Sequence, residues 1–420
     1  MKRRLIKIGK GSKSKDRVAM FKDLTSRDWE RESRLTMIQM LIPLGLQAVE
    51  KELQAEVSEL VGSRHSRGGN LKRWGYNPGS VYLGDQKASI AVPRVRNIDE
   101  DREVPLPSYS RLQDPSIIDD QILRHVINGM SQGKYEKAAT YVPQTFGINK
   151  SSVSRKFIRA SAKKLRQFLE RDLSKHDIVA IFMDGKYFAE NNIIIALGVT
   201  IEGEKVVLGF IEASTENHGV CRDFLNELKE RGLNLDNEIL FVIDGAKGLK
   251  KGILEVMGDK AIIHRCQWHK RENILNYLSD EHKNEYRTKL QRAYEQPTYE
   301  KAKSRLQLIR RELTLINQSA ANSLSEGFEE TLTLHRLGLF TKLGRSFKTT
   351  NCIESVNNQL ERYTGRVSHW QTSDHRRRWI ATALLEIEPK LRKVMGHDYL
   401  KDLRAAMKSL AAQIQKEHAA

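Results

Sequence analysis

Apolar positions recur at helical spacing near the start of the chain. Between residues 35 and 61 they fall on one stripe, which predicts a helix, and a stretch rich in Gly, Ser and Arg follows. Residues 79–95 then alternate polar and apolar around a central Gly-Asp pair, as two antiparallel strands joined by a turn would. We therefore predict an N-terminal helical element and a β-hairpin within residues 17–110. Residues 1–16 have no periodic apolar face and predict a basic tail.

Residues 111–175 return to a helical pattern, beginning at Pro115, and contain a candidate DNA-reading unit. A glycine turn at Gly147 separates a short predicted helix, residues 135–141, from a helix whose first turns carry hydroxyl and basic side chains. This arrangement is typical of a helix-turn-helix, in which the second helix reads DNA. A surface helical hairpin with ordinary caps is the alternative. The candidate DNA-contacting residues are Lys150, Ser151, Ser152, Ser154, Arg155 and Lys156.

Residues 176–265 change to an α/β rhythm. The predicted strands cover residues 178–183, 193–201, 205–211, 238–243 and 260–264, and the predicted helices cover residues 217–231 and 247–257. Three consecutive strands followed by alternating helices and strands is the order of a ribonuclease H-like fold. We therefore predict an α/β protein with a core of this type.

The rest of the chain is predicted to be helical. Residues 266–345 are rich in Glu, Lys, Arg and Leu without β-branched runs, which predicts an all-helical insertion into the core. Residues 346–375 are expected to complete the core with a helix at 351–363. Residues 376–420 form a basic helical C-terminal region.

Charge favours a polyanionic partner. Lys and Arg number 71 against 53 Asp and Glu, a formal net charge of +18. Such a field attracts nucleic acid, although surface cations that serve only solubility are the alternative. A second set of candidate DNA contacts, or else a solvated basic helix face, comprises Arg362, Arg366, Arg376, Arg377 and Arg378.

Two compositional features bear on location. The longest apolar stretches, such as residues 193–199, are far shorter than the roughly 18 residues that span a bilayer, so no membrane association is expected. Three scattered cysteines are too few for a disulfide framework and fit a reducing compartment. We expect a cytoplasmic protein.

Three carboxylates are candidate metal ligands. Asp184 and Asp244 are each expected to close a strand, at the edge of the sheet where ligands bind, and Glu354 follows on a later helix. Oxygen ligands of this kind suit Mg²⁺, for which Mn²⁺ is expected to substitute, and a pair of such ions can catalyse phosphodiester chemistry. Taken singly, each aspartate could be a turn former, and Glu354 could belong to a capping box with Thr350.

Several motifs together resemble a known family. They are FMDG at 182–185, LGF at 208–210 through Glu216, the run 228–233, IDGAKGL at 243–249, HRCQWHKREN at 264–273 and TTNCIESVN at 349–357. In order and separation they are similar to the Mutator-like DDE transposases, bacterial insertion-sequence branch. The resemblance implies a ribonuclease H-like core with a helical insertion and a catalytic triad of Asp184, Asp244 and Glu354. It also implies double-stranded DNA partners, namely transposon terminal inverted repeats and target DNA, and a homodimer or larger synaptic complex.

The pair Cys266 and His269 accompanies this resemblance. A structural zinc site normally needs four protein ligands, and no second pair follows at a suitable spacing, so zinc is not expected. We interpret the pair as a buried junction at the start of the helical segment, with His269 near the active site or DNA.

The sequence thus predicts metal-dependent DNA cleavage and strand transfer at the ends of a mobile element. Two other functions stay open. One is a DNA-binding repressor derived from a transposase, and the other is a ribonuclease H-type nuclease that cuts without joining.

Overall fold

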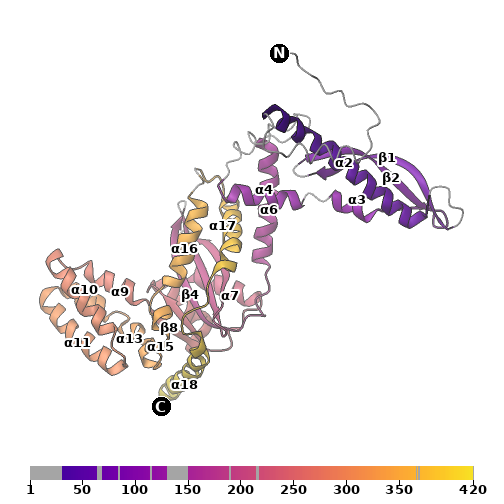
Figure 1. Cartoon of the computed structure of the whole chain (residues 1–420). Coiled ribbons are helices and arrows are strands. Elements are labelled where there is room, and N and C mark those ends of the chain that lie inside the picture. The colour runs from indigo at the N-terminus through magenta and orange to yellow at the C-terminus, as the bar shows by residue number, and fades with distance from the viewer. Residues whose placement is uncertain are drawn as a thin grey trace. The chain divides into compact units, whose positions relative to one another are not determined.

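A computed structural model describes residues 31–63, 69–83, 86–113, 116–129, 150–188, 191–213, 217–365, 367 and 369–419. The chain is a mixed α/β protein, as predicted, and it divides into two compact units, Met1–Ala160 and Ser161–Ala420. Figure 1 shows the order of helices and sheets along the chain. None of the helices among the described residues combines the length and apolar character needed to cross a bilayer.

The first unit contains a long helix and a small antiparallel sheet. Helix α2 (Arg31–Val61) packs against strands β1 (Leu71–Leu83) and β2 (Gln86–Asn97), and β3 (Arg102–Val104) extends the sheet beside β2. The core between them is formed by buried aliphatic residues, among them Leu53, Val57, Val81 and Val95. The predicted hairpin is therefore confirmed, and its strands are longer than the alternating pattern indicated.

Three further helices follow. They are α3 (Pro107–Leu112), α4 (Ser116–Ile127) and α6 (Lys150–Leu169). Helix α4 confirms the helix predicted after Pro115, and its Ile122 and Val126 are buried. The predicted helix 135–141 and the turn at Gly147 lie outside the described residues. The helix-turn-helix therefore stays a prediction, of which α6 supplies the second helix.

The second unit is built on a five-stranded mixed sheet. In sheet order its strands are β6 (Lys205–Ala213), β5 (Asn191–Thr200), β4 (Ile178–Phe188), β7 (Ile239–Ile243) and β8 (Ala261–Arg265). The first three are antiparallel neighbours, whereas β7 and β8 run parallel to β4. All five residues of β7 are buried, as expected for a strand covered on both faces.

Helices cover both faces of this sheet. On one face α7 (His218–Glu230) and α8 (Lys247–Met257) pack together, and the short 3₁₀ helix η2 (Gly258–Lys260) leads into β8. Phe224 and Leu228 of α7 and Ile253 of α8 join the sheet in one apolar core. On the other face the Phe182 ring stacks on Phe347 at a centroid distance of 5.5 Å.

Residues 267–347 contain helices and no strand. They are α9 (Gln267–Leu275), α10 (Asp280–Tyr294), α11 (Tyr299–Ile316), α12 (Gln318–Ser325), α13 (Phe328–Thr331), α14 (Thr333–Arg336) and α15 (Phe340–Phe347). This segment has an apolar core of its own, in which Leu290, Leu306 and Leu324 are fully buried. The predicted all-helical character is confirmed.

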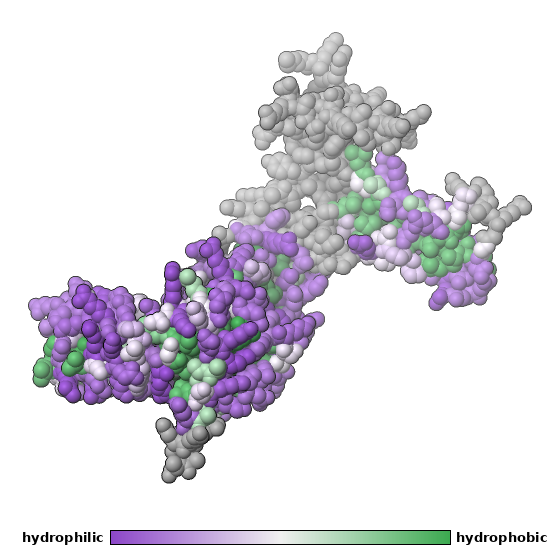
Figure 2. Space-filling view, turned by 60° about the horizontal axis from the view of Figure 1, so that its bottom comes forward, coloured by the Kyte–Doolittle hydropathy of each residue, from purple (hydrophilic) through white to green (hydrophobic). Residues whose placement is uncertain are grey.

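The chain then returns to the sheet. Helix α16 (Asn351–Thr364) contacts β4, and α17 (Ser373–Ile387) packs beside α16 (Figure 1). The 3₁₀ helices η3 (Glu388–Lys390) and η4 (His397–Tyr399) precede the last helix, α18 (Leu400–Ala419). The predicted C-terminal helical region is therefore two helices separated by a loop. On the face seen in Figure 2 the surface is mostly hydrophilic, with small separate hydrophobic patches.

One predicted boundary is wrong. Asp184 does not close its strand, because β4 continues to Phe188 and remains paired with β5, Asp184 lying opposite Ile195. The parallel partner β7 ends earlier, since its last pair with β4 joins Met183 to Ile243. Asp184 therefore stands where β4 leaves the parallel part of the sheet and continues as a two-stranded ribbon with β5.

Candidate active site

Asp184 on β4 and Asp244, directly after β7, lie at the same end of two neighbouring parallel strands. Each directly follows a residue of the last parallel pair, Met183 with Ile243. Because side chains alternate along a strand, Asp184 faces the same side as Phe182, which is the face covered by α15 and α16. The register thus brings these two carboxylates to one edge of the sheet.

Helix α16 connects to this edge through a hydrogen bond. The side-chain amide of Asn357 donates to Asp184 Oδ2 at 3.0 Å. Glu354 precedes Asn357 by three positions, and side chains at this spacing lie on the same face of a helix. The helix therefore presents Glu354 on the face that contacts Asp184.

The turn after Asp244 is closely packed. Asp244 Oδ1 accepts a hydrogen bond from the backbone N–H of Ala246 at 2.8 Å, so the turn-former interpretation is right for one of its oxygens. Gly245 has a φ of +107°, in the left-handed region that favours glycine. A Cβ atom there would collide with the guanidinium of Arg265, whose side chain is buried. The backbone beside Asp244 is thus held in one conformation.

Glu354 is bonded differently from a capping-box glutamate. The Thr350 hydroxyl donates to Glu354 Oε1 at 2.6 Å, and the Thr350 side chain makes no capping bond to the helix backbone. The capping-box alternative is therefore wrong for this helix. Thr350 itself is fully buried.

Cys266 and His269 join the same network. The buried Cys266 Sγ accepts hydrogen bonds from the backbone N–H groups of His269 at 3.5 Å and Thr350 at 3.4 Å. The Thr350 hydroxyl also lies 3.3 Å from His269 Nδ1. One threonine thus contacts the cysteine, the histidine and Glu354, which places the motif at the candidate active site.

The electrostatics of this pair are coupled. The pKa of His269 is raised to about 9, first by a hydrogen bond to Cys266 and further by the charges of Cys266, Asp244 and Glu354, against the opposing effect of burial. Burial raises the pKa of the Cys266 thiol, but hydrogen bonds and the charge of His269 outweigh this effect and lower it overall. A protonated His269 would stand beside two carboxylates that belong to different elements.

The donor chemistry fits a hard divalent cation. Asp184, Asp244 and Glu354 offer only oxygen, which Mg²⁺ and Mn²⁺ prefer, whereas zinc favours sulfur and nitrogen. In this conformation the described part of the chain contains no group of three His, Cys, Asp or Glu side chains arranged to hold a metal ion. Glu354 Oε1 accepts a hydrogen bond from Thr350, so only Oε2 is left without that bond.

The first set of candidate DNA contacts lies at the start of α6. Ser154 is half-buried and Arg155 is exposed, while the Lys156 ammonium lies 5.8 Å from the centre of the Tyr82 ring. Lys150 begins the helix. The side chains of Lys150, Ser151 and Ser152 lie outside the described residues.

In the second set of candidate DNA contacts, some arginines are exposed and others form ion pairs within the chain. Arg362 and Arg377 are exposed, and Arg366 lies outside the described residues. Arg376 Nε pairs with Glu212 Oε1 at 2.5 Å. Arg378 is buried, pairs with Asp374 at 2.7 Å and donates to the Ser161 hydroxyl at 2.9 Å. DNA contact by these residues stays a prediction, and the available cations are Arg362 and Arg377.

Sequence reasoning did not assign a role to Asn357, and it considered Thr350 only as part of a capping box. Helical spacing offered a signal for both, because Asn357 lies three positions after Glu354 and Thr350 lies four before it. Their partners on β4 and α9 are distant in sequence, so the contacts themselves needed the fold.

Comparison with known proteins identifies the family. Residues 25–392 match the family model described as "Transposase, Mutator family". The transposase for insertion sequence element IS905 of Lactococcus lactis subsp. lactis (strain IL1403) is 25% identical over 352 residues, covering 80% of this chain and 85% of that protein. The transposase for element ISRM5 of Rhizobium meliloti (strain 1021) is 25% identical over 368 residues, covering 85% and 89%. The transposase for element IS256 in transposon Tn4001 of Staphylococcus aureus is 25% identical over 353 residues, covering 80% and 84%. With most of its length matched, the chain belongs to the Mutator family of transposases.

Proposed function

We propose that this chain is a DDE transposase with a ribonuclease H-like catalytic core and a helical insertion. The observation that carries the proposal is the meeting of three elements: Asp184 on β4, Asp244 after β7, and Glu354 on α16, which is bonded to β4 through Asn357. The strand order β6-β5-β4-β7-β8 and the helical segment 267–347 before α16 support the fold assignment.

The reaction follows from the carboxylates. Bound Mg²⁺ or Mn²⁺ would activate a water or a 3′-hydroxyl and stabilise the leaving oxygen. Asp184, Asp244 and Glu354 would hold these ions, Asn357 would orient Asp184, and Thr350 would release Glu354. In the first step, water forms a bond to phosphorus and the bond to the 3′-oxygen breaks, which leaves a 3′-hydroxyl at the element's end. In the second step, that hydroxyl attacks a target phosphodiester and displaces another 3′-oxygen.

DNA recognition is proposed for both units. The exposed Arg155 near the start of α6 suits terminal inverted repeats, and Arg362 and Arg377 suit the backbone phosphates of DNA at the core. Because two element ends must be joined to one target, a homodimer or larger synaptic complex follows from the proposed reaction.

Charge-removing variants test the proposal. Asp184→Asn, Asp244→Asn and Glu354→Gln should each abolish Mg²⁺-dependent cleavage and joining while binding of element ends persists, because charge is lost with little change of shape. Asp280→Asn, at an aspartate with a 94% exposed side chain on α10, is the matched control and should remain active. Cleavage that survives any one triad variant would remove that residue from the site.

The same assay separates the alternatives. A repressor would bind ends without cutting, and a nuclease would cut ends but yield no joined product. Strand-transfer product from the unmodified chain would exclude both.

A further inference from the structure

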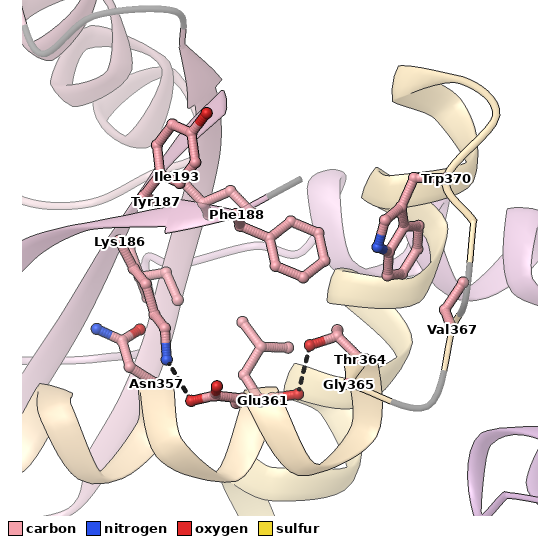
Figure 3. A pocket seen from close by; sticks show the side chains of 12 residues that line it. Lys186, Tyr187, Phe188, Ile193, Asn357, Glu361, Thr364, Gly365, Val367 and Trp370 are labelled. Carbon is pink, nitrogen blue, oxygen red and sulfur yellow. Dashed lines mark hydrogen bonds and ion pairs between the residues drawn. The ribbon is translucent and has the colours of Figure 1, made fainter. Parts of the chain in front are cut away.

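A cavity of about 220 Å³ lies beside the candidate active site, which is large against the roughly 30 Å³ that one water occupies. It opens between β4, β5, the second half of α16 and the segment after that helix. Figure 3 shows the Phe188 ring and the Trp370 indole next to each other at the cavity, with Lys186 and Glu361 joined by an ion pair nearby. Its lining includes Lys186, Phe188, Asn357, Glu361 and Trp370.

Strand β4 leads from the carboxylates into this cavity. Asp184, Lys186 and Phe188 occupy every second position and therefore share one face. At roughly 3.3 Å per residue, Phe188 lies about 13 Å along the strand from Asp184. Because nucleotides follow one another at about 3.4 Å along a stacked strand, the cavity is within about four nucleotides of a phosphate held at Asp184.

Helix α16 runs beside these three residues of β4, and two of its side chains form hydrogen bonds with them. Asn357 donates to Asp184 at 3.0 Å, and Lys186 Nζ donates to Glu361 Oε2 at 2.8 Å. One wall of the cavity is therefore the same helix that carries the candidate catalytic Glu354. The Lys186 side chain is 31% exposed and offers a cation at the cavity.

The lining combines aromatic faces with an unsatisfied acceptor. The Phe188 and Trp370 rings meet edge to face at a centroid distance of 5.0 Å. The Trp370 ring also packs against Trp379 and His375, at centroid distances of 6.1 Å and 5.1 Å. Asn357 is only 5% exposed, and its Oδ1 has no hydrogen-bond partner among the described residues. A buried acceptor without a donor is costly, so it marks a place where a ligand can donate.

We propose that this cavity holds one unpaired nucleobase of the DNA strand cut at the candidate active site. A base supplies a flat apolar surface for Phe188 and Trp370 and an N–H donor for Asn357 Oδ1. Extracting a base within about four nucleotides of the cut would fix the strand against β4 and keep the phosphate at the carboxylates. This inference rests on the proposed function and adds the binding of an extruded base to it.

The test uses the full chain and element-end duplexes that carry 2-aminopurine, a base whose fluorescence rises on unstacking, at single positions around the cut. One position should brighten on binding to the unmodified chain. Trp370→Leu and Phe188→Leu should abolish the rise and slow cleavage about tenfold, as expected for a lost base–aromatic stack. Trp370→Phe should restore both, because it retains an aromatic face. A mismatch at the bright position should accelerate the Leu variants more than the unmodified chain, since the base is already unpaired.

Controls separate the possible failures. Tyr277→Leu replaces an aromatic residue that is 52% exposed in the helical segment and should leave the fluorescence unchanged. If the unmodified chain does not cut the duplex, the proposed function fails. If it cuts but no position brightens, or if the folded Leu variants brighten equally, the base pocket is overturned. Thermal unfolding of each variant establishes folding, and a variant that does not fold is replaced by Phe188→Tyr or Trp370→Tyr, which should retain the rise.

Discussion

The Asn357 amide donates a hydrogen bond to Asp184 Oδ2 across 3.0 Å, joining two residues that are 173 positions apart in the chain. Between them lie four strands of the sheet and the whole helical segment 267–347. The bond ties α16 to β4 at the position of the first candidate carboxylate. The position of the helix at the site is therefore coupled directly to that of the strand.

Asn357→Leu should slow cleavage and reduce stability. The substitution removes the group that orients Asp184, and a hydrogen bond to a charged group contributes about 1.5–3 kcal/mol to the free energy of unfolding. Cleavage rates and denaturant unfolding measure the two effects, and binding of element ends should persist. Asn358→Leu, at the exposed next position of the same helix, is the control. Equal cleavage by both variants would show that Asp184 needs no such partner.

Gly245→Ala should destabilise the turn that presents Asp244. The left-handed φ of +107° is unfavourable for alanine by roughly 1–2 kcal/mol, and the new methyl group would also collide with Arg265. Gly338→Ala separates these two causes, because Gly338 has a φ of +70° with no atom near the added Cβ. Denaturant unfolding should show a larger loss for Gly245→Ala. Equal losses would mean that Arg265 moves aside freely.

Arg155→Ala should weaken DNA binding through phosphate contact. Each lost contact of this kind lowers the slope of log affinity against log salt by about 1. Binding of element ends and of random duplex by the full chain, measured over a range of salt concentrations, gives the slopes. Arg111→Ala replaces another exposed helical arginine of the first unit and serves as the control. An unchanged slope in Arg155→Ala would exclude this residue from the DNA interface.

Local patterns were sufficient for most elements of the second unit. Helix α8 has the predicted bounds, and β5, β6, β7 and β8 lie within two residues of their predictions, because each of these strands contains a run of apolar residues. β4 differs because Lys186 and Tyr187 are polar or exposed, a local pattern typical of a loop. Pairing with β5 overrides that local signal.

The site was predictable only as far as strand ends determine it. The adjacency of Asp184 and Asp244 follows from parallel neighbouring strands, which the alternation of strands and helices already indicates. The bonds of Asn357 and Thr350 depend on how α16 docks on β4 and α9, and no local periodicity specifies that docking. The same reason explains why Arg376 and Arg378, which look like surface cations in sequence, are paired inside the unit.

Zinc should be absent from the Cys266 and His269 motif. Beyond the pair, the Thr350 hydroxyl lies 3.5 Å from Cys266 Sγ and 3.3 Å from His269 Nδ1, and a threonine is no substitute for the further ligands that a four-coordinate structural zinc site needs. Elemental analysis of tag-free dialysed protein should give much less than one zinc per chain, and a zinc-selective chelator should not unfold it. Stoichiometric zinc that is lost in Cys266→Ser would overturn this expectation and make the site structural.

The stability contributed by His269 should depend on pH. Its pKa is raised from 6.5 to about 9 in the folded chain, so the protonated form favours folding. This contribution is fully present below about pH 6.5 and is lost as the pH rises through about 9.

In buffers free of divalent cations, the difference in unfolding free energy between the unmodified chain and His269→Gln should therefore shrink over this interval. A change on the order of 1 kcal/mol is expected, because each pKa unit corresponds to about 1.36 kcal/mol and partial exposure screens the charges. The same comparison in a Cys266→Ser background should be flatter, since the hydrogen bond to Cys266 is the largest cause of the raised pKa. An equal difference at both ends of the interval would mean that the pKa of His269 is not raised in the folded chain.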